Sequence, residues 1–516
     1  MKNVTIVFWN ALAICVAVVI WGVIAPDQLE SVTANVTSYF STTFGWYYLL
    51  IIMIMLVFCV YLIFSRFGKI KLGKEDDEPS FSLPSWFAML FSAGMGVGLV
   101  FWTTAEPVSH AFKSTPGAEP GSDQAIKESL RYAFFHWGVH AWAVYGIVAL
   151  VLAYFKFHRG SPGLISATLE PLLGEKRMRG PLGKSIDTLA VFATVIGVAS
   201  TLGFGSAQLN GGLSFLFGIP ANFGVQFSIL VISTILFIGS AWTGVGKGIK
   251  YLSNINMGIA IVLLLLLLIV GPTLYILNMF TSTLGGYMTH FFDMSFHLAP
   301  QDQENRDWVN KWTLFYWAWW ISWAPFVGIF IARISKGRTV KEFMLGVLAV
   351  PSLLCFIFFA VFGASALYLE QNGIATISDF PVETATFGML QNFPLGDLMS
   401  FITILVVAIF FITSADSATF VLGMLSTSGS LNPSNSVKSV WGLTQSALAA
   451  IIVYFGGTQG LQNVLIIAAL PFSIVILLMG LSFYKVTNKQ LTSRREGKST
   501  GKVDHTLVES DQANTG

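Results

Sequence analysis

Uncharged apolar runs recur along the chain, and each is long enough to cross a bilayer. One runs from Thr313 to Ala332 without a charged residue, which is sufficient helix for a hydrocarbon core of about 30 Å. Charged residues make up only 11% of the chain and apolar residues 54%, whereas soluble domains are about 25% charged. We therefore predict an all-α membrane protein. Apolar length predicts twelve transmembrane helices, near residues 5–25, 47–65, 86–108, 133–155, 187–218, 225–243, 252–278, 313–334, 343–369, 397–425, 440–456 and 462–484.

Loop charge orients these spans. The first loop, residues 26–46, contains no Lys or Arg, whereas the second, residues 66–74, contains four. Basic loops stay on the cytoplasmic side of a membrane, and the alternation continues along the chain, so both termini are predicted to be cytoplasmic. Residues 426–437 carry no charge, and only Lys438 at the end of that loop favours the inside. The net charge of +2 gives no reason to expect a nucleic-acid partner.

Glycine and proline interrupt two of the spans. Gly94, Gly96 and Gly98 alternate inside the third span, and each glycine costs roughly 1 kcal/mol in a helix interior. Alternate spacing does not form the four-residue packing motif of small residues, so this segment is predicted to be unwound. Pro325 removes a backbone hydrogen bond from the eighth span and is predicted to open that helix. Spans three and eight start on opposite sides, so spans 3–7 and 8–12 are predicted to be inverted repeats with a binding site near the bilayer midplane.

This organisation divides the chain into five parts. Two N-terminal helices and a basic cytoplasmic loop fill residues 1–80, and the two five-helix repeats fill residues 81–280 and 313–484. An external amphipathic connector is expected over residues 281–312. The polar tail, residues 485–516, is short of aromatic residues and is expected to be disordered. Its basic residues are interpreted either as a contact with anionic lipid or as an ordinary solvated end.

Aromatic residues cluster in two of the spans. Five of the fifteen tryptophans lie between Trp312 and Trp323, and the fourth span contains Trp137, Trp142 and Tyr145. Aromatic ring faces attract a quaternary ammonium by about 2 kcal/mol or more when the site is desolvated. The two clusters therefore predict a cage for a methylated cation, and the alternative is an interfacial aromatic belt.

Polar side chains inside the spans offer a second kind of site. Thr413 and Ser414 are hard-oxygen ligands suited to a small hard cation, although hydroxyls also form ordinary interhelical hydrogen bonds. Asp416 is an intramembrane acid and a functional candidate by default, with bracing of a neighbouring helix as the alternative. His136 and His140 are interpreted as structural residues rather than proton carriers.

These stretches together resemble the betaine/choline/carnitine transporter family. The resemblance is carried by WTLFYWAWWISWAPF at residues 312–326, GMGVG at 94–98 and TSADS at 413–417, and it covers nearly the whole chain except the tail. It implies a LeuT-like fold of twelve helices whose first two lie outside the inverted repeats. It also implies a homotrimer in a bacterial plasma membrane that takes up trimethylammonium compounds by alternating access.

The resemblance also implies which residues form the sites. The substrate site would comprise Trp137, Trp142, Tyr145, Trp320, Trp323, Met95, Gly94, Gly96 and Gly98. One sodium site would use the backbone of Ser92, Ala93, Met95 and Phe410 with the hydroxyls of Thr413 and Ser414. A second sodium site would use Thr194 and Phe326. The chain departs from the family pattern at Val198, where a threonine is expected, and this weakens the second site unless Ser200 or Thr201 substitutes for it.

The glycine segment bears on the choice of substrate. Choline carriers of the family are similar to GxGxD, whereas this chain has Gly98 at the acidic position. A zwitterion such as glycine betaine brings its own carboxylate, which backbone N–H groups at an unwound helix can bind. We therefore expect a secondary active transporter that imports glycine betaine, or a related compatible solute, by sodium symport for osmoprotection. Sodium is the coupling ion, and no other cofactor is expected.

Two alternatives remain at the level of the sequence. One is a proton-coupled or exchange carrier for quaternary amines of the choline or carnitine type. The other is a channel or osmosensor without coupled transport. An enzyme is the weakest interpretation, because the sequence presents no nucleophile–base pair, metal-ligand motif or phosphate-binding loop.

Overall fold

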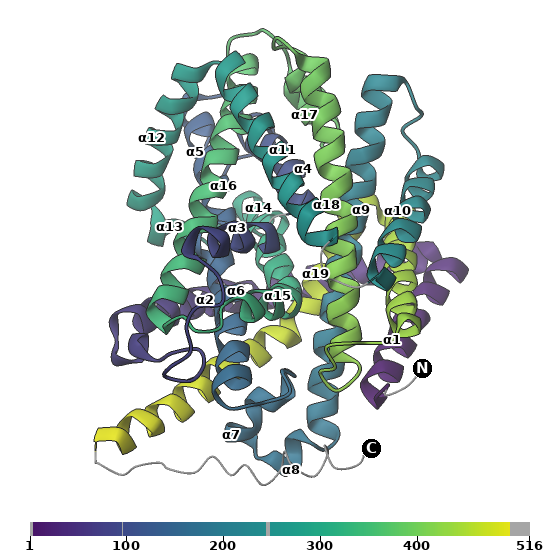
Figure 1. Cartoon of the computed structure of the whole chain (residues 1–516). Coiled ribbons are helices and arrows are strands. Elements are labelled where there is room, and N and C mark those ends of the chain that lie inside the picture. Colours follow the sequence, from purple (N-terminus) through teal and green to yellow (C-terminus); the bar gives the residue numbers. More distant parts are fainter. Residues whose placement is uncertain (1–3, 95, 244–247, 496–516) are drawn as a thin grey trace.

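The computed structural model describes residues 4–94, 96–243 and 248–495, and within these ranges the chain is built from helices with two isolated β-bridges (Figure 1). Eleven helices of the described chain are long and apolar enough to cross a membrane. They are α1 (Ile6–Ile24), α2 (Pro26–Phe64), α5–η2 (Asp123–His158), α9 (Pro181–Phe217), α10 (Phe223–Thr243), α11 (Gly248–Val270, counted from Leu252), α14–α15 (Gln303–Ile334), α16 (Val340–Gln371), α18 (Gly396–Leu425) and two parts of α19 (Asn435–Phe455 and Gln462–Ser493).

Shorter elements connect these helices. They are η1 (Arg66–Lys69), η3 (Ser166–Leu169), α7 (Glu170–Leu173), α8 (Glu175–Met178), α12 (Thr273–Thr289), α13 (Phe291–Phe296), η4 (Ile377–Asp379) and α17 (Ala385–Leu390). Helices α7 and α8 lie at one end of the bundle, and α17 lies at the opposite end (Figure 1).

The third predicted span is present as two helices. Helix α3 (Leu83–Gly94) stops inside the glycine segment, and α4 (Val97–Phe112) starts directly after it. Gly96 has extended backbone angles at the start of α4. The prediction of an unwound segment is therefore confirmed, and the break explains why the span does not count among the eleven long helices.

A second break lies in the fourth span, where none was predicted. Helix α5 (Asp123–Trp137) ends at Gly138, which is extended, and α6 (Val139–Ala153) begins immediately afterwards. A single glycine is tolerated inside many helices, so Gly138 alone did not predict an interruption. A further break, at Gly457 in α19 (Asn435–Arg495), has φ +49° and separates the last two predicted spans.

The prediction that Pro325 opens its helix is wrong. Helix α15 (Thr313–Ile334) runs through Pro325 without interruption. Proline removes one backbone N–H. However, other helices enclose α15, and 94% of the most apolar 18-residue stretch of Gln303–Ile334 is buried. Packing on all sides maintains the helix where the missing hydrogen bond alone would weaken it. Only the first of the two predicted repeats therefore starts with a broken helix.

Two boundaries also differ from the predictions. The seventh span ends at Val270, because Gly271 and Pro272 interrupt it. Helix α12 then starts at Thr273, inside the predicted span, and continues to Thr289, inside the predicted connector. Helix α19 continues to Arg495, so the first eleven residues of the expected disordered tail are helical. The side chain of Gln490 accepts a 2.7 Å hydrogen bond from Tyr154, and such packing stabilises helix that composition alone did not predict.

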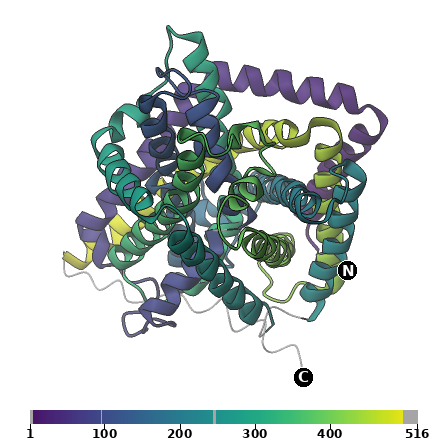
Figure 2. The same ribbon diagram turned by 90° about the horizontal axis from the view of Figure 1, so that it is seen from above.

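The most buried helices form the centre of the bundle. The apolar windows of Asp123–His158 and Pro181–Phe217 are 94% and 89% buried, whereas those of α1 and α10 are 28% and 22% buried. Helix α15 packs against α6, α9 and α19, and Figure 2 shows the bundle along its length. A Cβ atom on Gly328 of α15 would lie 2.5 Å from the side chain of Val148, so glycine permits α15 and α6 to approach closely.

Candidate aromatic binding site

Rings from three helices meet at the centre of the bundle. Trp137 of α5 and Trp320 of α15 pack edge to face, with ring centroids 4.9 Å apart. Tyr145 of α6 also packs edge to face with Trp320, with the two ring centroids 6.1 Å apart. These three side chains are at most 4% exposed. Desolvated aromatic faces are the surfaces that bind a cation without N–H groups, so these rings have the chemistry that such a ligand requires.

The break at Gly138 helps to fix this arrangement. The last carbonyls of a helix have no intrahelical partner, and His136 lies in the last turn of α5. Its carbonyl accepts a 3.0 Å hydrogen bond from the indole nitrogen of Trp320. The interruption in one span therefore orients a ring in another.

Trp142 and Trp323, which were predicted to share the cage, lie farther from the ring pair. Trp142 packs edge to face with Tyr145, at 5.6 Å, and lies against Cys355 of α16. Trp323 is one turn along α15 and contacts Phe326 at 5.5 Å. Tyr145 thus connects Trp142 to the centre, whereas Trp323 forms a separate layer.

The glycine segment lies against the same rings. A Cβ atom on Gly98 would lie 2.6 Å from Trp319 and 3.6 Å from Trp137. A Cβ atom on Gly96 would lie 3.8 Å from Trp323. The unwound backbone and the aromatic rings therefore form one site. Gly94 ends α3, and Met95 lies outside the described residues.

Two further aromatic residues of α15 belong to this cluster and were not among the predicted site residues. Trp319 stacks on Trp320 with centroids 5.4 Å apart, and Tyr316 stacks on Trp320 at 5.8 Å. The indole nitrogen of Trp319 is buried without a hydrogen-bond partner in the described structure. Tyr316 shares a helical face with Trp320 in the sequence, whereas Trp319 was not identifiable because its role depends on contact with Gly98.

The predicted hydroxyl ligands on α18 lie beside the break. The Ser414 hydroxyl is 3.3 Å from the position that a Cβ atom on Gly96 would occupy. The Thr413 hydroxyl donates to the carbonyls of Ile409, at 2.9 Å, and Phe410, at 3.3 Å. Ser92 and Ala93 lie in the last turn of α3, and their side chains lie outside the described residues. The structure therefore brings Ser414 to the unwound segment.

The residues of the second predicted sodium site lie on neighbouring helices. Gly197 of α9 contacts Trp323 of α15, and Phe204 contacts Trp319, so the two helices are antiparallel. Thr194, one turn before Gly197, is consequently level with Phe326, one turn after Trp323. The Thr194 hydroxyl donates to Ala190 O at 2.8 Å.

Of three further positions on α9, one offers no oxygen to such an ion and two carry hydroxyls. Val198, where a threonine was expected, is buried and apolar. The hydroxyls of Ser200 and Thr201 donate to carbonyls one turn earlier in the helix, at 3.0 and 3.2 Å. The hydroxyl of Thr194 makes the same kind of bond, so the register of the two antiparallel helices, rather than hydrogen bonding, distinguishes Thr194.

The intramembrane acid of α18 joins two helices. Asp416 accepts a 2.5 Å hydrogen bond from Ser240 of α10. Lys438 donates to the carbonyl of Ala241, the next residue of α10, at 2.6 Å. This geometry corresponds to the bracing interpretation of Asp416. His140 is also in an interhelical contact, with its ring nitrogen 2.9 Å from the hydroxyl of Ser295 in α13.

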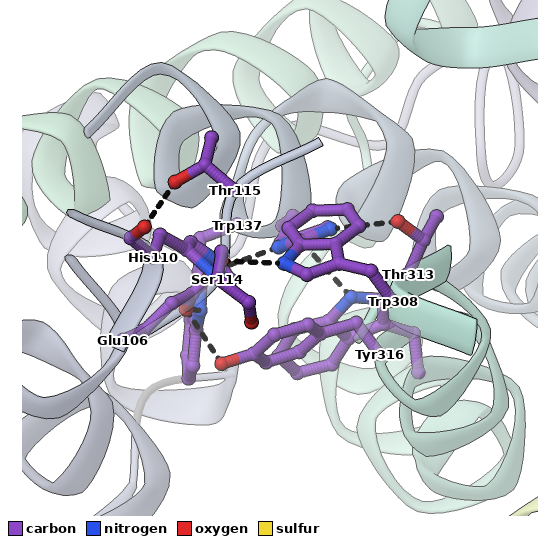
Figure 3. A network of polar contacts seen from close by, with 10 residues as sticks. Glu106, His110, Ser114, Thr115, Trp137, Trp308, Thr313 and Tyr316 are labelled. Carbon is purple, nitrogen blue, oxygen red and sulfur yellow. Dashed lines mark hydrogen bonds and ion pairs between the residues drawn. The ribbon is translucent and has the colours of Figure 1, made fainter. Parts of the chain in front are cut away.

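A buried carboxylate next to the rings was not among the predicted site residues. Glu106 of α4 is fully buried, and Figure 3 shows it beside His110, Trp137 and Tyr316. One oxygen accepts from Trp137 at 2.9 Å and from Tyr316 at 2.5 Å. The other lies 2.7 Å from His136 and 3.3 Å from His110. An acid in a membrane span is a functional candidate by default, and that signal was present in the sequence.

The same cluster has the spacing of a metal site. Ligand atoms of Glu106, His110 and His136 lie within 4.8 Å of one another. However, both histidine nitrogens facing Glu106 already bond to its carboxylate, and the second nitrogen of His136 lies 3.0 Å from the hydroxyl of Thr313. With the ligand atoms already bonded to one another, the cluster is better described as a hydrogen-bond network.

A wide cleft of about 1700 Å³ lies away from the aromatic rings, beside α7 and α8. Its lining includes the basic residues Arg159, Arg179, Lys184, Lys485 and Lys489 together with three acidic residues. This cleft has the composition of an exposed polar surface and shares no residue with the ring cluster.

Comparison with known proteins identifies the family. Residues 6–492 match the betaine/carnitine/choline family transporter model. The glycine betaine transporter OpuD of Bacillus subtilis is 56% identical over 504 residues, which are 98% of each chain. A probable glycine betaine transporter of Desulfitobacterium hafniense is 41% identical over 94% of this chain and 97% of its own. An ectoine/hydroxyectoine transporter of Virgibacillus pantothenticus is 42% identical over 94% and 96%.

These relatives are bacterial, and the match covers the long apolar helices and the aromatic site together. The family consists of transporters, so the chain is not an enzyme. The predicted resemblance is confirmed along the length of the described bundle. This multi-pass membrane protein belongs to the betaine/carnitine/choline transporter family.

Proposed function

We propose that this chain imports glycine betaine, or a closely related compatible solute, by sodium symport with alternating access, and so provides osmoprotection. The observation that carries the proposal is the buried contact between Trp137 and Trp320 beside an unwound helix. A trimethylammonium group cannot donate a hydrogen bond, so aromatic faces are its natural partners. Relatives named for glycine betaine and for ectoine support the same class of solute.

The chemistry of the unwound segment favours a zwitterion. Gly98 has no carboxylate to neutralise a simple cation, and Trp319 fills the space that a side chain there would need. The first N–H groups of α4, which starts at Val97, have no intrahelical acceptors and attract an anion. Glycine betaine carries both the cation for the rings and the carboxylate for these N–H groups.

Sodium coupling rests on the oxygen atoms around the break. The last carbonyls of α3, which include those of Ser92 and Ala93, lack intrahelical partners. Together with the hydroxyls of Thr413 and Ser414 and the carbonyl of Phe410 they offer the hard-oxygen ligands that sodium prefers. For the second site, Thr194 and Phe326 share one level of the bundle. Because Val198 supplies no oxygen, we infer that this second site binds sodium more weakly than the first.

We further infer a LeuT-like arrangement of twelve spans. With α3 and α4 taken as one interrupted span, the eleven long helices become twelve. Spans 3–7 and 8–12 would then be inverted repeats, and both termini would be cytoplasmic in a bacterial plasma membrane. A homotrimer is the assembly that the family resemblance implies, and the basic cleft beside α7 and α8 is suited to the negative surface of a cytoplasmic leaflet.

Uptake by purified protein in liposomes tests the proposal. Radiolabelled glycine betaine should accumulate above its external concentration when an inward sodium gradient is imposed. Replacing sodium by potassium on both sides should abolish accumulation. Equal uptake with and without the gradient would reject sodium coupling, and uptake that only equilibrates would indicate a channel. A panel containing ectoine, proline, choline and carnitine defines the solute.

Proton coupling is the second candidate, because Glu106 and two histidines lie next to the rings. Trp137 and Tyr316 both donate to the carboxylate, which favours a constant network over one that gains and loses a proton in each cycle. Accumulation driven by an inward proton gradient in sodium-free buffer would establish this alternative instead.

A further inference from the structure

We propose that Glu106 is a positioning residue of the substrate site, because it holds two walls of the aromatic cage in place from the broken span. The inference rests on the proposed function and adds a residue that none of the ring contacts includes. Glu106 lies in α4, ten residues beyond Gly96 and three turns into the helix that follows the break. It therefore links the unwound segment to α5 and α15.

One oxygen of Glu106 fixes the two rings. Its Oε2 atom accepts from the indole nitrogen of Trp137 at 2.9 Å and from the hydroxyl of Tyr316 at 2.5 Å. Both rings pack on Trp320, with centroids 4.9 and 5.8 Å away. Hydrogen bonds to an ionised acceptor are about twice as strong as neutral ones. A single atom thus sets the orientation of two rings that contact the third.

The other oxygen anchors the carboxylate itself. Its Oε1 atom lies 2.7 Å from His136 and 3.3 Å from His110. The ring of His136 stacks on Tyr316 at 4.7 Å, and its second nitrogen contacts Thr313 at 3.0 Å. The four groups that face the carboxylate come from α4, α5 and α15. The carboxylate therefore cannot turn without breaking contacts to three helices.

Burial of the Glu106 carboxylate has a free-energy cost that its contacts have to offset. Burying a charge is costly unless it is paired and hydrogen-bonded, and replacing a buried polar cluster by apolar residues is often neutral or stabilising. The contacts of Glu106 compensate for its burial, and two of them end on cage rings. The negative charge also lies beside the cage, where it favours a cationic ligand by Coulomb attraction. The ring orientation that Glu106 fixes and its negative charge thus both favour a cationic ligand.

The test compares Glu106→Gln with Glu128→Gln in the liposome uptake assay. Gln keeps the shape of Glu, but its NH2 group donates and so cannot accept the bonds that one carboxylate oxygen receives. Glu128 is the matched control, since it is a buried acid of α5 that pairs with Arg131 at 3.2 Å and contacts no cage ring. We expect the KM for glycine betaine to rise about tenfold or more in Glu106→Gln, because a hydrogen bond to a charged group contributes a factor of roughly ten to a hundred. The kcat should change by less than about threefold.

A double-mutant cycle separates positioning from a general structural role. Tyr316→Phe keeps the ring and removes one donor to Glu106. If Glu106 acts through Tyr316, the KM increase of the double variant should be clearly smaller than the product of the two single increases. Glu106→Asp, which keeps the charge on a shorter side chain, should restore part of the lost affinity. Size-exclusion chromatography of each variant in detergent verifies that the protein is folded.

The outcomes are distinct. A Glu106→Gln protein with an unchanged KM, or independent effects of the two changes, overturns the positioning role while wild-type uptake stands. If both Glu106 variants fail to fold, an unchanged KM in Tyr316→Phe has the same consequence. Wild-type protein that accumulates no solute of the panel rejects the proposed function and this inference together.

Discussion

The indole nitrogen of Trp320 donates to the main-chain carbonyl of His136 at 3.0 Å. That carbonyl lies in the last turn of α5, and the helix ends at Gly138 directly afterwards. The position of the ring therefore depends on a break in another span. Such a contact orients an aromatic face without using any side-chain polar group.

Replacement of Trp320 by Leu should weaken substrate binding. Loss of a desolvated cation–π partner costs about 2 kcal/mol, which corresponds to an increase in KM of roughly thirtyfold. Uptake of radiolabelled glycine betaine across a concentration series measures the change. Trp46→Leu is the matched control, because Trp46 on α2 is 52% exposed at the surface of the bundle. Equal KM values for the two variants would remove Trp320 from the cage.

Addition of a single methyl group at Gly98 should slow transport. Its Cβ atom would lie 2.6 Å from the ring of Trp319, so Gly98→Ala must displace a ring that is packed on all sides. We expect a fall in kcat/KM of about tenfold or more, since overpacking costs about 1–3 kcal/mol. Gly258→Ala in α11 provides the control, because a Cβ atom there meets nothing within 4 Å. Wild-type uptake by Gly98→Ala would show that the close contact is not required.

Ser414→Ala should weaken the response to sodium more than the response to substrate. The hydroxyl lies beside Gly96 at the break, where we place the first sodium site. Loss of one oxygen ligand is expected to raise the sodium concentration for half-maximal uptake by about tenfold. The free energy of one such contact with an ion is similar to that of a hydrogen bond to a charged group. Ser417→Ala, one turn farther along α18, is the comparison. A sodium dependence equal to that of the wild type would exclude Ser414 as a ligand.

Chelation of divalent metals should leave transport unchanged. Glu106, His110 and His136 are close enough to hold an ion, but the atoms that would bind it are already hydrogen-bonded to one another. Uptake by protein incubated with EDTA, compared with untreated protein and with protein given zinc after EDTA, is the measurement. Activity that disappears with EDTA and returns with zinc would mean that the cluster binds a metal.

Arg338 should stabilise the start of the broken span. Its guanidinium lies 4.1 Å from the centre of the Trp86 ring and donates to Phe81 O at 2.8 Å, and the side chain is 2% exposed. Arg338→Ala leaves that carbonyl without its donor, so we expect a loss of about 1–3 kcal/mol in unfolding free energy and a lower Tm. Arg179→Ala is the control, since the Arg179 side chain is 67% exposed. Thermal unfolding followed by chromatography compares them, and equal Tm values would contradict the expectation.

The loop between α2 and α3 is joined to the residues after α15 by an ion pair and by backbone hydrogen bonds. Asp77 accepts from the backbone N–H of Lys74 at 2.8 Å and pairs with Lys336 at 3.2 Å. These two contacts lower the pKa of the Asp77 carboxyl. Backbone hydrogen bonds between Leu72 and both Gly337 and Arg338 run beside them. The loop is thereby joined to the end of α15, far along the chain.

Several features of this protein follow from sequence alone, because they depend on composition and spacing within one segment. Apolar length identified the spans, and the alternating glycines identified the break between α3 and α4. The aromatic runs marked both sides of the ring cluster, since each lies within a short stretch of the sequence. Hydropathy and helix propensity depend on neighbouring residues in the chain, so a single segment of sequence is enough to predict spans and breaks.

Other features required the tertiary structure, because they are contacts between segments that are distant in the chain. Neighbouring helices keep α15 intact at Pro325, although proline alone predicts a break. The break at Gly138 leaves a carbonyl that orients the Trp320 ring. Trp319 belongs to the site only because Gly98 lies against it. Glu106 was visible as an acid in a membrane span, but its partners come from three helices. Packing and hydrogen-bond geometry between helices decided which of the candidate residues meet.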